Sequence, residues 1–278
     1  MLKLKKALII HIGATENDLG VYAPIFDNGE FIFIPRPESE NPKLTPTYRE
    51  LGYGAFFLPE LVEILDWHAH YDPEFETFTY GNYEKEGDIQ GYEKLRRGDY
   101  LFFITSLEWY SFSEERPPWI EPRGYYLIGY FTIDRIDKAS ELTLNEIFNI
   151  YRNNAHVRRL LSWIPDVGLE KAMEKEDWNK LILFKGGQEK SAILRVAVPF
   201  SKGKHYTTVG GRKRVAWWPN ELAHKVFSFK TNQDIQKRYE TSGGKWWHGI
   251  IEGERIKYIL EAITEKNPEQ AEKINFKP

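Results

Sequence analysis

The apolar residues of this chain stand mostly in short, strand-length runs separated by glycine, proline and polar residues. These runs are Leu8–Ile12, Phe31–Ile34, Tyr100–Ile104, Tyr125–Ile133, Leu181–Phe184 and Ile193–Val198. Apolar residues recur at helical spacing in fewer places, which are Phe56–Trp67, Leu142–Leu161 (interrupted at Asn153 and Asn154) and Ile250–Ile263. Short strands with fewer helices predict an α+β fold, with a mixed, partly closed β-barrel as its core and helices at its flanks.

Two turn sequences predict how neighbouring runs connect. Asp27–Gly29 follows the first run and precedes Phe31–Ile34, and its residue types favour a hairpin turn. Lys185–Gly187 stands between the last two runs, which we expect to pair with each other around it.

The length of 278 residues and an apolar share of 41% allow one large domain or two small ones. We expect an α+β core over residues 1–200, with the barrel part at about 95–200. Residues 201–278 form a basic, aromatic-rich C-terminal segment that ends in a helix and is expected to pack on the core.

Several classes of protein are excluded by composition. The chain has no cysteine, so disulfides, thiolate zinc sites, iron–sulfur clusters and a cysteine nucleophile are ruled out. No apolar run approaches the roughly 18–20 residues of a membrane-spanning helix. The basic, then apolar start is broken at His11 and Gly13 and lacks a small-residue cleavage pattern, which favours a first strand over a signal peptide. Few glutamines and only two methionines beside abundant Glu, Lys and Ile indicate a thermophile, and we expect a cytoplasmic protein with no membrane partner.

Positive charge is concentrated in one stretch of the sequence. Residues 202–248 carry ten basic and three acidic residues, a net +7 in a chain whose total is −3. Cations neutralise phosphates and aromatic rings stack on bases, so this stretch predicts contact with a nucleic-acid backbone. A solvated basic face with its aromatics in the core is the alternative. The predicted backbone-binding residues are Lys204, Arg212, Lys213, Arg214, Trp217, Trp218, Lys245, Trp246 and Trp247.

The segment from Asp66 to Asp72 alternates chemically active residues. On an extended strand Asp66, His68, His70 and Asp72 share one face and could converge on a metal ion. The His-x-His-x-Asp pattern resembles part of the metallo-β-lactamase signature, but Pro73 stands where that signature has a further histidine. We therefore expect no cofactor, and His68, His70 and Asp72 remain the candidate ligands of an alternative metal site.

Three further segments carry residue types suited to nucleotide chemistry. Asn154–Arg159 combines a histidine with two arginines. These side chains are suited to binding a phosphate or a base edge; the alternative is that they form a charged helix surface. Lys185–Gly187 could bring backbone amides to an anion or simply turn the chain. Ser106–Tyr110 leaves a predicted strand with aromatic side chains, which could grip an extruded base or plug a barrel end.

Five short motifs, taken in their order along the chain, resemble one family. This family is the third of the numbered series of nucleotide modification associated domains. The motifs are Asp18–Phe26, Tyr71–Phe75 with Thr79–Gly81, Gly98–Phe103, Asn154–Arg159 and Lys185–Gly187. The family is inferred to act with systems that make, read or restrict modified bases. The resemblance therefore implies a biological context more than a particular chemical reaction. A fainter similarity to PUA-like barrels (the EVE, ASCH and YTH groups) covers residues 95–133 and implies a modified base held in an aromatic pocket.

Together these features predict a nucleic-acid-binding protein that recognises a modified nucleotide in an aromatic pocket. The predicted nucleotide-binding residues are Tyr80, Trp109, Tyr110, Asp72, Asn154, His156, Arg158, Arg159 and Lys185. The alternative is a hydrolase or transferase acting on the nucleotide or nucleobase, with Asp72 or Asp18 as general base and His156 as acid, or with a metal. A module that binds other proteins through exposed aromatics is a third possibility.

Overall fold

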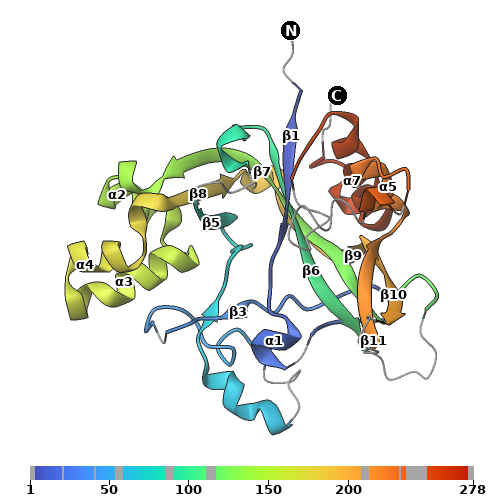
Figure 1. Cartoon of the computed structure of the whole chain (residues 1–278). Coiled ribbons are helices and arrows are strands. Elements are labelled where there is room, and N and C mark those ends of the chain that lie inside the picture. Colours follow the sequence, from blue (N-terminus) through green and yellow to red (C-terminus); the bar gives the residue numbers. More distant parts are fainter. Residues whose placement is uncertain are drawn as a thin grey trace.

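The computed structural model describes residues 4–20, 22–40, 42–53, 59–84, 91–110, 117–207, 213–231, 233–235 and 249–274 (Figure 1). Most of the strands join one mixed sheet in the order β12-β1-β6-β7-β8-β5, with β2 also pairing with β6 and β9 with β7. β1 and β2 run parallel to β6, and the other pairs are antiparallel. The strands of this sheet are β1 (Lys6–His11), β2 (Ala23–Ile25), β5 (Thr79–Tyr83), β6 (Tyr100–Trp109), β7 (Arg123–Lys138), β8 (Leu181–Gly186), β9 (Ala192–Pro199) and β12 (Ile250–Glu252).

Two small sheets and several helices complete the described structure. β3 (Arg36–Pro37) pairs with β4 (Ala69–His70), and β10 (Ser201–Thr207) pairs with β11 (Lys213–Pro219). The α-helices are α1 (Glu16–Leu19), α2 (Leu144–Tyr151), α3 (Ala155–Val167), α4 (Leu169–Lys175), α5 (Glu221–Phe227) and α7 (Glu254–Lys266). A 3₁₀ helix covers Pro59–Asp66.

The centre of the sheet is buried on both faces, which explains the continuous apolar runs of β1 and β6. Successive side chains of a strand point to opposite faces. In β6, Leu101 and Phe103 therefore enter one core, while Phe102 and Ile104 enter another. Helices α5 and α7 cover the second face (Figure 1), and N-terminal segments that include Phe33 pack on the first.

β7 changes partners along its length. Its first half pairs with β6 and β9, and from Ile133 onward it pairs with β8, with a register shift between Ile133 and Arg135. This carries β8 and β5 toward α2, α3 and α4, which lie at the far side from α5 and α7 in Figure 1. A third core, with Tyr151, Leu160 and Trp178, holds these helices against β8. The cavity described below lies between this region and β1.

The α+β class is confirmed, and so are several predicted elements. The runs at residues 100–104 and 125–133 are the cores of β6 and β7, and the predicted helix over 142–161 is broken at Asn153 and Asn154 into α2 and α3. The barrel is not confirmed: among the described residues the path from β12 to β5 is open, with no pairing between its ends.

Three local predictions are wrong because strand pairing depends on distant partners. β8 and β9 do not pair with each other, since both are partners of β7. Phe31–Ile34 forms no strand, and Phe31 makes only an isolated bridge to Ile25. The C-terminal helix begins at Glu254 rather than Ile250, because Ile250–Glu252 pairs with β1 as β12.

The C-terminal elements contact the rest of the chain directly. Ile256, Ile259 and Ile263 of α7 share a core with Ile9 and Phe102 of the central strands. The domain boundary at residue 200 stays a prediction. Among the described residues, no helix combines the length and apolarity required to span a bilayer.

Candidate active site

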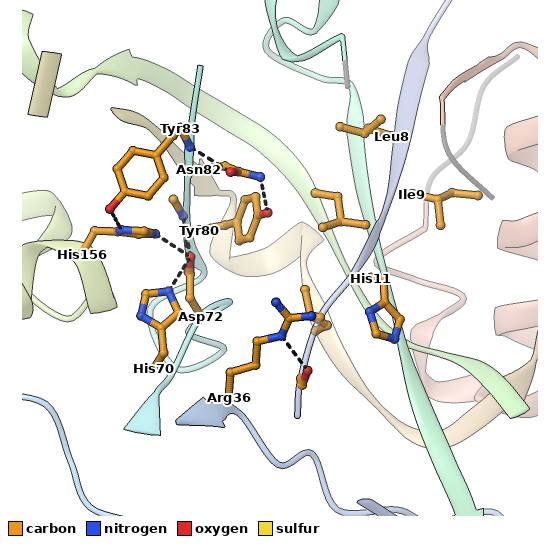
Figure 2. A pocket seen from close by; sticks show the side chains of 14 residues that line it. Leu8, Ile9, His11, Arg36, His70, Asp72, Tyr80, Asn82, Tyr83 and His156 are labelled. Atoms are coloured by element: carbon orange, nitrogen blue, oxygen red, sulfur yellow. Dashed lines mark hydrogen bonds and ion pairs between the residues drawn. The ribbon is translucent and has the colours of Figure 1, made fainter. Parts of the chain in front are cut away.

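A cavity of about 340 Å³ lies beside β1, with β5 and α3 opposite (Figure 2). One wall is the segment Leu8–Gly13, which is mainly apolar. The other walls carry polar side chains, and the backbone of Gly81, from four separate parts of the chain. These residues are Arg36, His70, Asp72, Tyr80, Gly81, Asn82, Tyr83 and His156.

Three titratable side chains converge on this cavity. Asp72 Oδ2 lies 3.5 Å from His156 Nε2 and 4.0 Å from His70 Nε2. The two imidazoles meet edge to face, with ring centroids 4.7 Å apart. The side chains of Asp72 and His156 are almost fully buried, and that of His70 is 20% exposed. Figure 2 shows the three groups facing one another from β4, the following loop and α3.

The Asp72 carboxylate is fixed by donors on two elements. The Gly81 N–H in β5 donates to Oδ2 at 3.0 Å, and the Asn154 amide donates to Oδ1 at 3.3 Å. Asn154 is also the N-cap of α3, because its Oδ1 accepts from the His156 N–H at 3.1 Å. One side chain therefore starts the helix that carries His156 and orients the carboxylate that faces it.

A buried carboxylate stands behind each histidine. His70 Nδ1 lies 2.8 Å from Glu38 Oε1, and His156 Nδ1 lies 2.8 Å from Glu176 Oε1. Arg159 joins the two acids, at 3.0 Å from Glu38 Oε2 and 2.7 Å from Glu176 Oε2. Because ionised carboxylates only accept hydrogen bonds, Nδ1 of each imidazole carries a proton and Nε2 faces the cavity.

The electrostatics of this network hold its acids ionised. Burial alone would raise the pKa of Glu176, but hydrogen bonds from His156 and Arg159 outweigh burial and lower that pKa to about 2. Burial likewise opposes ionisation of Glu38, yet His70 and Arg159 keep the pKa of its carboxyl below the ordinary value. Burial alone would lower the pKa of His156, but the adjacent Asp72 and Glu176 carboxylates raise it to about 9.

Polar groups suited to substrate recognition stand around the three titratable side chains. Asn82 Nδ2 donates to the hydroxyls of Tyr80, at 2.9 Å, and of Tyr92. Arg36 Nε donates to the Gly13 carbonyl at 3.2 Å, and its side chain is 54% exposed. A guanidinium at the edge of a cavity is suited to binding an anion.

Comparison with known protein families gives a match over most of the chain. A family model described as nucleotide modification associated domain 3 matches residues 6–254. The chain belongs to this family. No curated protein and no solved structure matches significantly. The resemblance inferred from the five motifs is thus confirmed, and the matched range includes every residue that lines the cavity.

In this nucleotide modification associated domain, several predicted site residues come together. Tyr80, Asp72 and His156 line the cavity. Behind them, Asn154 donates to Asp72, and Arg159 donates to the Glu176 carboxylate that contacts His156. His70, predicted only as a metal ligand, is the third member of the titratable cluster.

Other predicted residues are engaged elsewhere. Lys185 Nζ donates to the Thr77 carbonyl, and Arg158 donates to Asn153 Oδ1 at 3.1 Å. Asp18 accepts from the Thr15 N–H at 2.7 Å and does not line the cavity.

The predicted stacking residues Trp109, at the end of β6, and Tyr110, which follows it, also lie outside the cavity lining. Trp109 Nε1 donates to Asp27 Oδ1 at 2.7 Å. Tyr110 is half-exposed, and its ring meets Phe26 edge on.

The predicted metal trio is not assembled as proposed from the sequence. His68 Nδ1 lies 2.6 Å from the Thr45 carbonyl oxygen, so its ring turns to a different loop. Asp66 ends the 3₁₀ helix and pairs with Arg49 at the surface. His156, distant in sequence, occupies the place beside His70 and Asp72 that the pattern assigned to His68.

Of the predicted backbone-binding residues, Trp218 is half-buried in β11. Lys204, Lys213, Arg214 and Trp217 belong to β10 and β11, whose backbone is described. Arg212, Lys245, Trp246 and Trp247 lie outside the described residues.

Sequence reasoning missed Glu38, Glu176, Arg36 and Asn82. Glu176 stands in the charged run Glu174–Asp177, which resembles a solvated surface, and Arg36 stands between two prolines. Asn82 directly follows the Thr79–Gly81 motif, and this adjacency is the one signal that could have found it.

Proposed function

We propose that this chain is an enzyme that acts on a modified nucleotide or nucleobase, as a hydrolase or group transferase. The observation that carries the proposal is the placement of Asp72 Oδ2 and His156 Nε2, 3.5 Å apart on the wall of a cavity. The family, whose name associates it with nucleotide modification, supports the substrate class.

The character of the cavity favours catalysis over recognition alone. A pocket that only reads a base needs flat rings and a few hydrogen-bonding groups. This one concentrates histidines and acids, which are costly to bury and are typical of acid–base or metal-assisted catalysis. Glu38, Glu176 and Arg159 hold these groups from behind, as a preorganised site requires.

The size of the cavity supports a small substrate. At about 340 Å³ it lies at the lower end of the range of about 300–1,000 Å³ for ligand pockets. It suits one base or nucleoside, either free or extruded from a strand, with Tyr80 and Asn82 facing the base. The Arg36 guanidinium would contact the phosphate, and the basic residues of 201–248 would contact the backbone of a polymeric substrate.

Mass spectrometry of nucleosides tests the proposal. Purified protein is incubated with native, modification-bearing tRNA and genomic DNA and with unmodified copies, and the products are digested and compared. We expect a nucleoside of the native material to change or disappear with the wild-type chain and with His68→Ala. The change should be lost with Asp72→Asn. Tight binding of native material with no mass change would refute the proposed enzyme activity and support a protein that only recognises modified bases. Tyr80 and Asn82 in the cavity wall would contact the base in that case too.

A further inference from the structure

We propose that His70, Asp72 and His156 bind one divalent transition-metal ion through His70 Nε2, Asp72 Oδ2 and His156 Nε2. The inference deepens the proposed function, because it makes this ion the reactive centre of the same cavity. It differs from the trio expected from the sequence, in which His68 held the place of His156.

The spacing of the three atoms suits an ion between them. Asp72 Oδ2 is 3.5 Å from one Nε2 and 4.0 Å from the other, and all three atoms lie within 4.8 Å of one another. A tetrahedral ion with bonds of about 2.1 Å separates its ligand atoms by about 3.4 Å. The Asp72–His156 separation already matches this value, and the two imidazole Nε2 atoms have to approach each other by at most about 1.4 Å to reach coordination distance.

The two sides of each imidazole differ: the Nδ1 side, at the back, contacts a glutamate, and the Nε2 side, in front, faces the cavity. This difference argues against a simple buried ion-pair network. Behind the rings, the Nδ1-to-carboxylate distances are both 2.8 Å, which is direct hydrogen bonding. In front, the 3.5 and 4.0 Å separations exceed the usual hydrogen-bond range of about 2.7–3.2 Å. The protein thus holds each imidazole from behind and keeps its front atom apart from the others.

The back-side arrangement is the one that metal-ligating histidines use. A ligating histidine almost always donates its second N–H to a carboxylate or carbonyl, which fixes the tautomer and increases ligand basicity. Here Glu38 serves His70 and Glu176 serves His156, and Arg159 locks both acids in place. The Asp72 carboxylate is similarly oriented by the Gly81 N–H and Asn154.

The charge of the cluster also calls for a cation. Asp72, Glu38 and Glu176 contribute three carboxylates, against the single guanidinium of Arg159 that bridges two of them. In the metal-bound form both imidazoles are neutral, and the group of side chains then carries a net charge of −2. A divalent ion compensates this charge at the point where the three front atoms meet.

The donor set and the cavity indicate the kind of ion. Two imidazoles and one carboxylate suit Zn²⁺, Fe²⁺, Co²⁺ or Mn²⁺, whereas Mg²⁺ and Ca²⁺ prefer all-oxygen sites. Three protein ligands leave coordination positions open on the cavity side, where water or a substrate atom can bind.

The test measures metal binding by the purified full-length chain without any nucleotide. After chelator treatment and dialysis, the protein is titrated with Zn²⁺, with Mn²⁺, with Fe²⁺ under anaerobic conditions, and with Co²⁺ as a spectroscopic probe. We expect one ion per chain by elemental analysis and a Co²⁺ visible spectrum without thiolate bands. His70→Gln and Asp72→Asn should each weaken binding by at least about tenfold, and Glu38→Gln by about 10–100-fold.

His68→Ala is the matched control, because His68 is the neighbouring histidine and its ring is held by Thr45. It should bind the ions like the wild type, and circular dichroism checks that each variant is folded. The proposal is overturned if the wild type binds none of these ions at one equivalent, or if His70→Gln and Asp72→Asn bind as His68→Ala does.

The same preparations separate this inference from the proposed function. Nucleoside conversion that persists in chelated, metal-free protein would refute the metal site and leave the enzyme standing. One bound ion lost in both variants, without conversion of any nucleoside, would establish the metal site and refute the enzyme.

Discussion

The cluster of His70, Asp72 and His156 can form because residue 81 is a glycine and has no side chain. Gly81 lies in β5 opposite α3, and its N–H donates to Asp72. A Cβ at this position would collide with the imidazole of His156 and press on Asn154. Its backbone conformation is not the left-handed one that favours glycine, so close packing of the ring explains the residue.

Gly81→Ala should therefore displace His156 from Asp72. We expect about 1–3 kcal/mol of lost stability from overpacking and a loss of metal affinity and nucleoside conversion of about tenfold or more. Urea unfolding and Co²⁺ titration measure the two effects. Gly187→Ala is the control, because its Cβ would meet no atom nearer than 3.8 Å. Equal metal affinity in the two variants would contradict the packing argument.

At the scale of elements, the start of α3 links helix formation to the site. Asn154 caps this helix and donates its amide to Asp72. Asn220 does a similar thing elsewhere: it caps α5 and donates its amide to the Pro199 carbonyl at 2.7 Å. The chain thus offers two asparagine caps of the same construction, and only one of them touches the cavity residues.

Asn154→Ala and Asn220→Ala should each cost about 1–2 kcal/mol of unfolding free energy, the usual cost of losing a cap. Metal affinity should fall by about 10–100-fold in Asn154→Ala alone, because Asp72 loses an orienting donor. Chemical denaturation and metal titration of both variants check this. A parallel fall in Asn220→Ala would show that the loss follows from general destabilisation.

At the scale of the whole molecule, a cluster of phenylalanine rings connects the sheet to the segment beside the site. Phe131 of β7 is fully buried, with its ring centroid 4.7 Å from Phe103 and 5.7 Å from Phe75. Phe75 follows Asp72 by three residues, so the same cluster supports the loop that carries the carboxylate.

Phe131→Ala should lower the free energy of unfolding by about 3–5 kcal/mol, since it leaves a cavity at the junction of these elements. Phe148→Ala, at a ring 46% exposed on α2, should change stability by no more than about 0.5 kcal/mol. Urea unfolding followed by near- and far-ultraviolet circular dichroism measures both variants. A loss below 1 kcal/mol in Phe131→Ala, about the average for any point mutation, would mean that the ring cluster is not a central support.

Local sequence was enough wherever the structure depends on neighbouring residues. The strands at 100–104 and 125–133 follow from apolar runs bounded by turns, and the break between α2 and α3 follows from Asn154, a residue type that caps helices. The motifs around Asp72, Gly81 and His156 also indicated the family, because short motifs in a fixed order are properties of the chain itself.

Pairing and site assembly depended on contacts between distant segments. The residues Ile250–Glu252 could, by their types alone, form either a strand or the first turn of α7. They form a strand because they pair with β1. His68 and His70 are equivalent in the local pattern, yet only His70 turns toward Asp72, because the Thr45 carbonyl engages the other ring. Glu176 resembles a surface acid until α3 brings His156 and Arg159 against it.

The sequence alone therefore determined the α+β class, the positions of the central strands and of α2, α3 and α7, and the residue types available for chemistry, because these follow from local periodicity and composition. Tertiary structure decided which of those residues form a site. Burial, the hydrogen bonds behind each ring and the placement of β5 against α3 select His70, Asp72 and His156 from a larger set of chemically equal candidates.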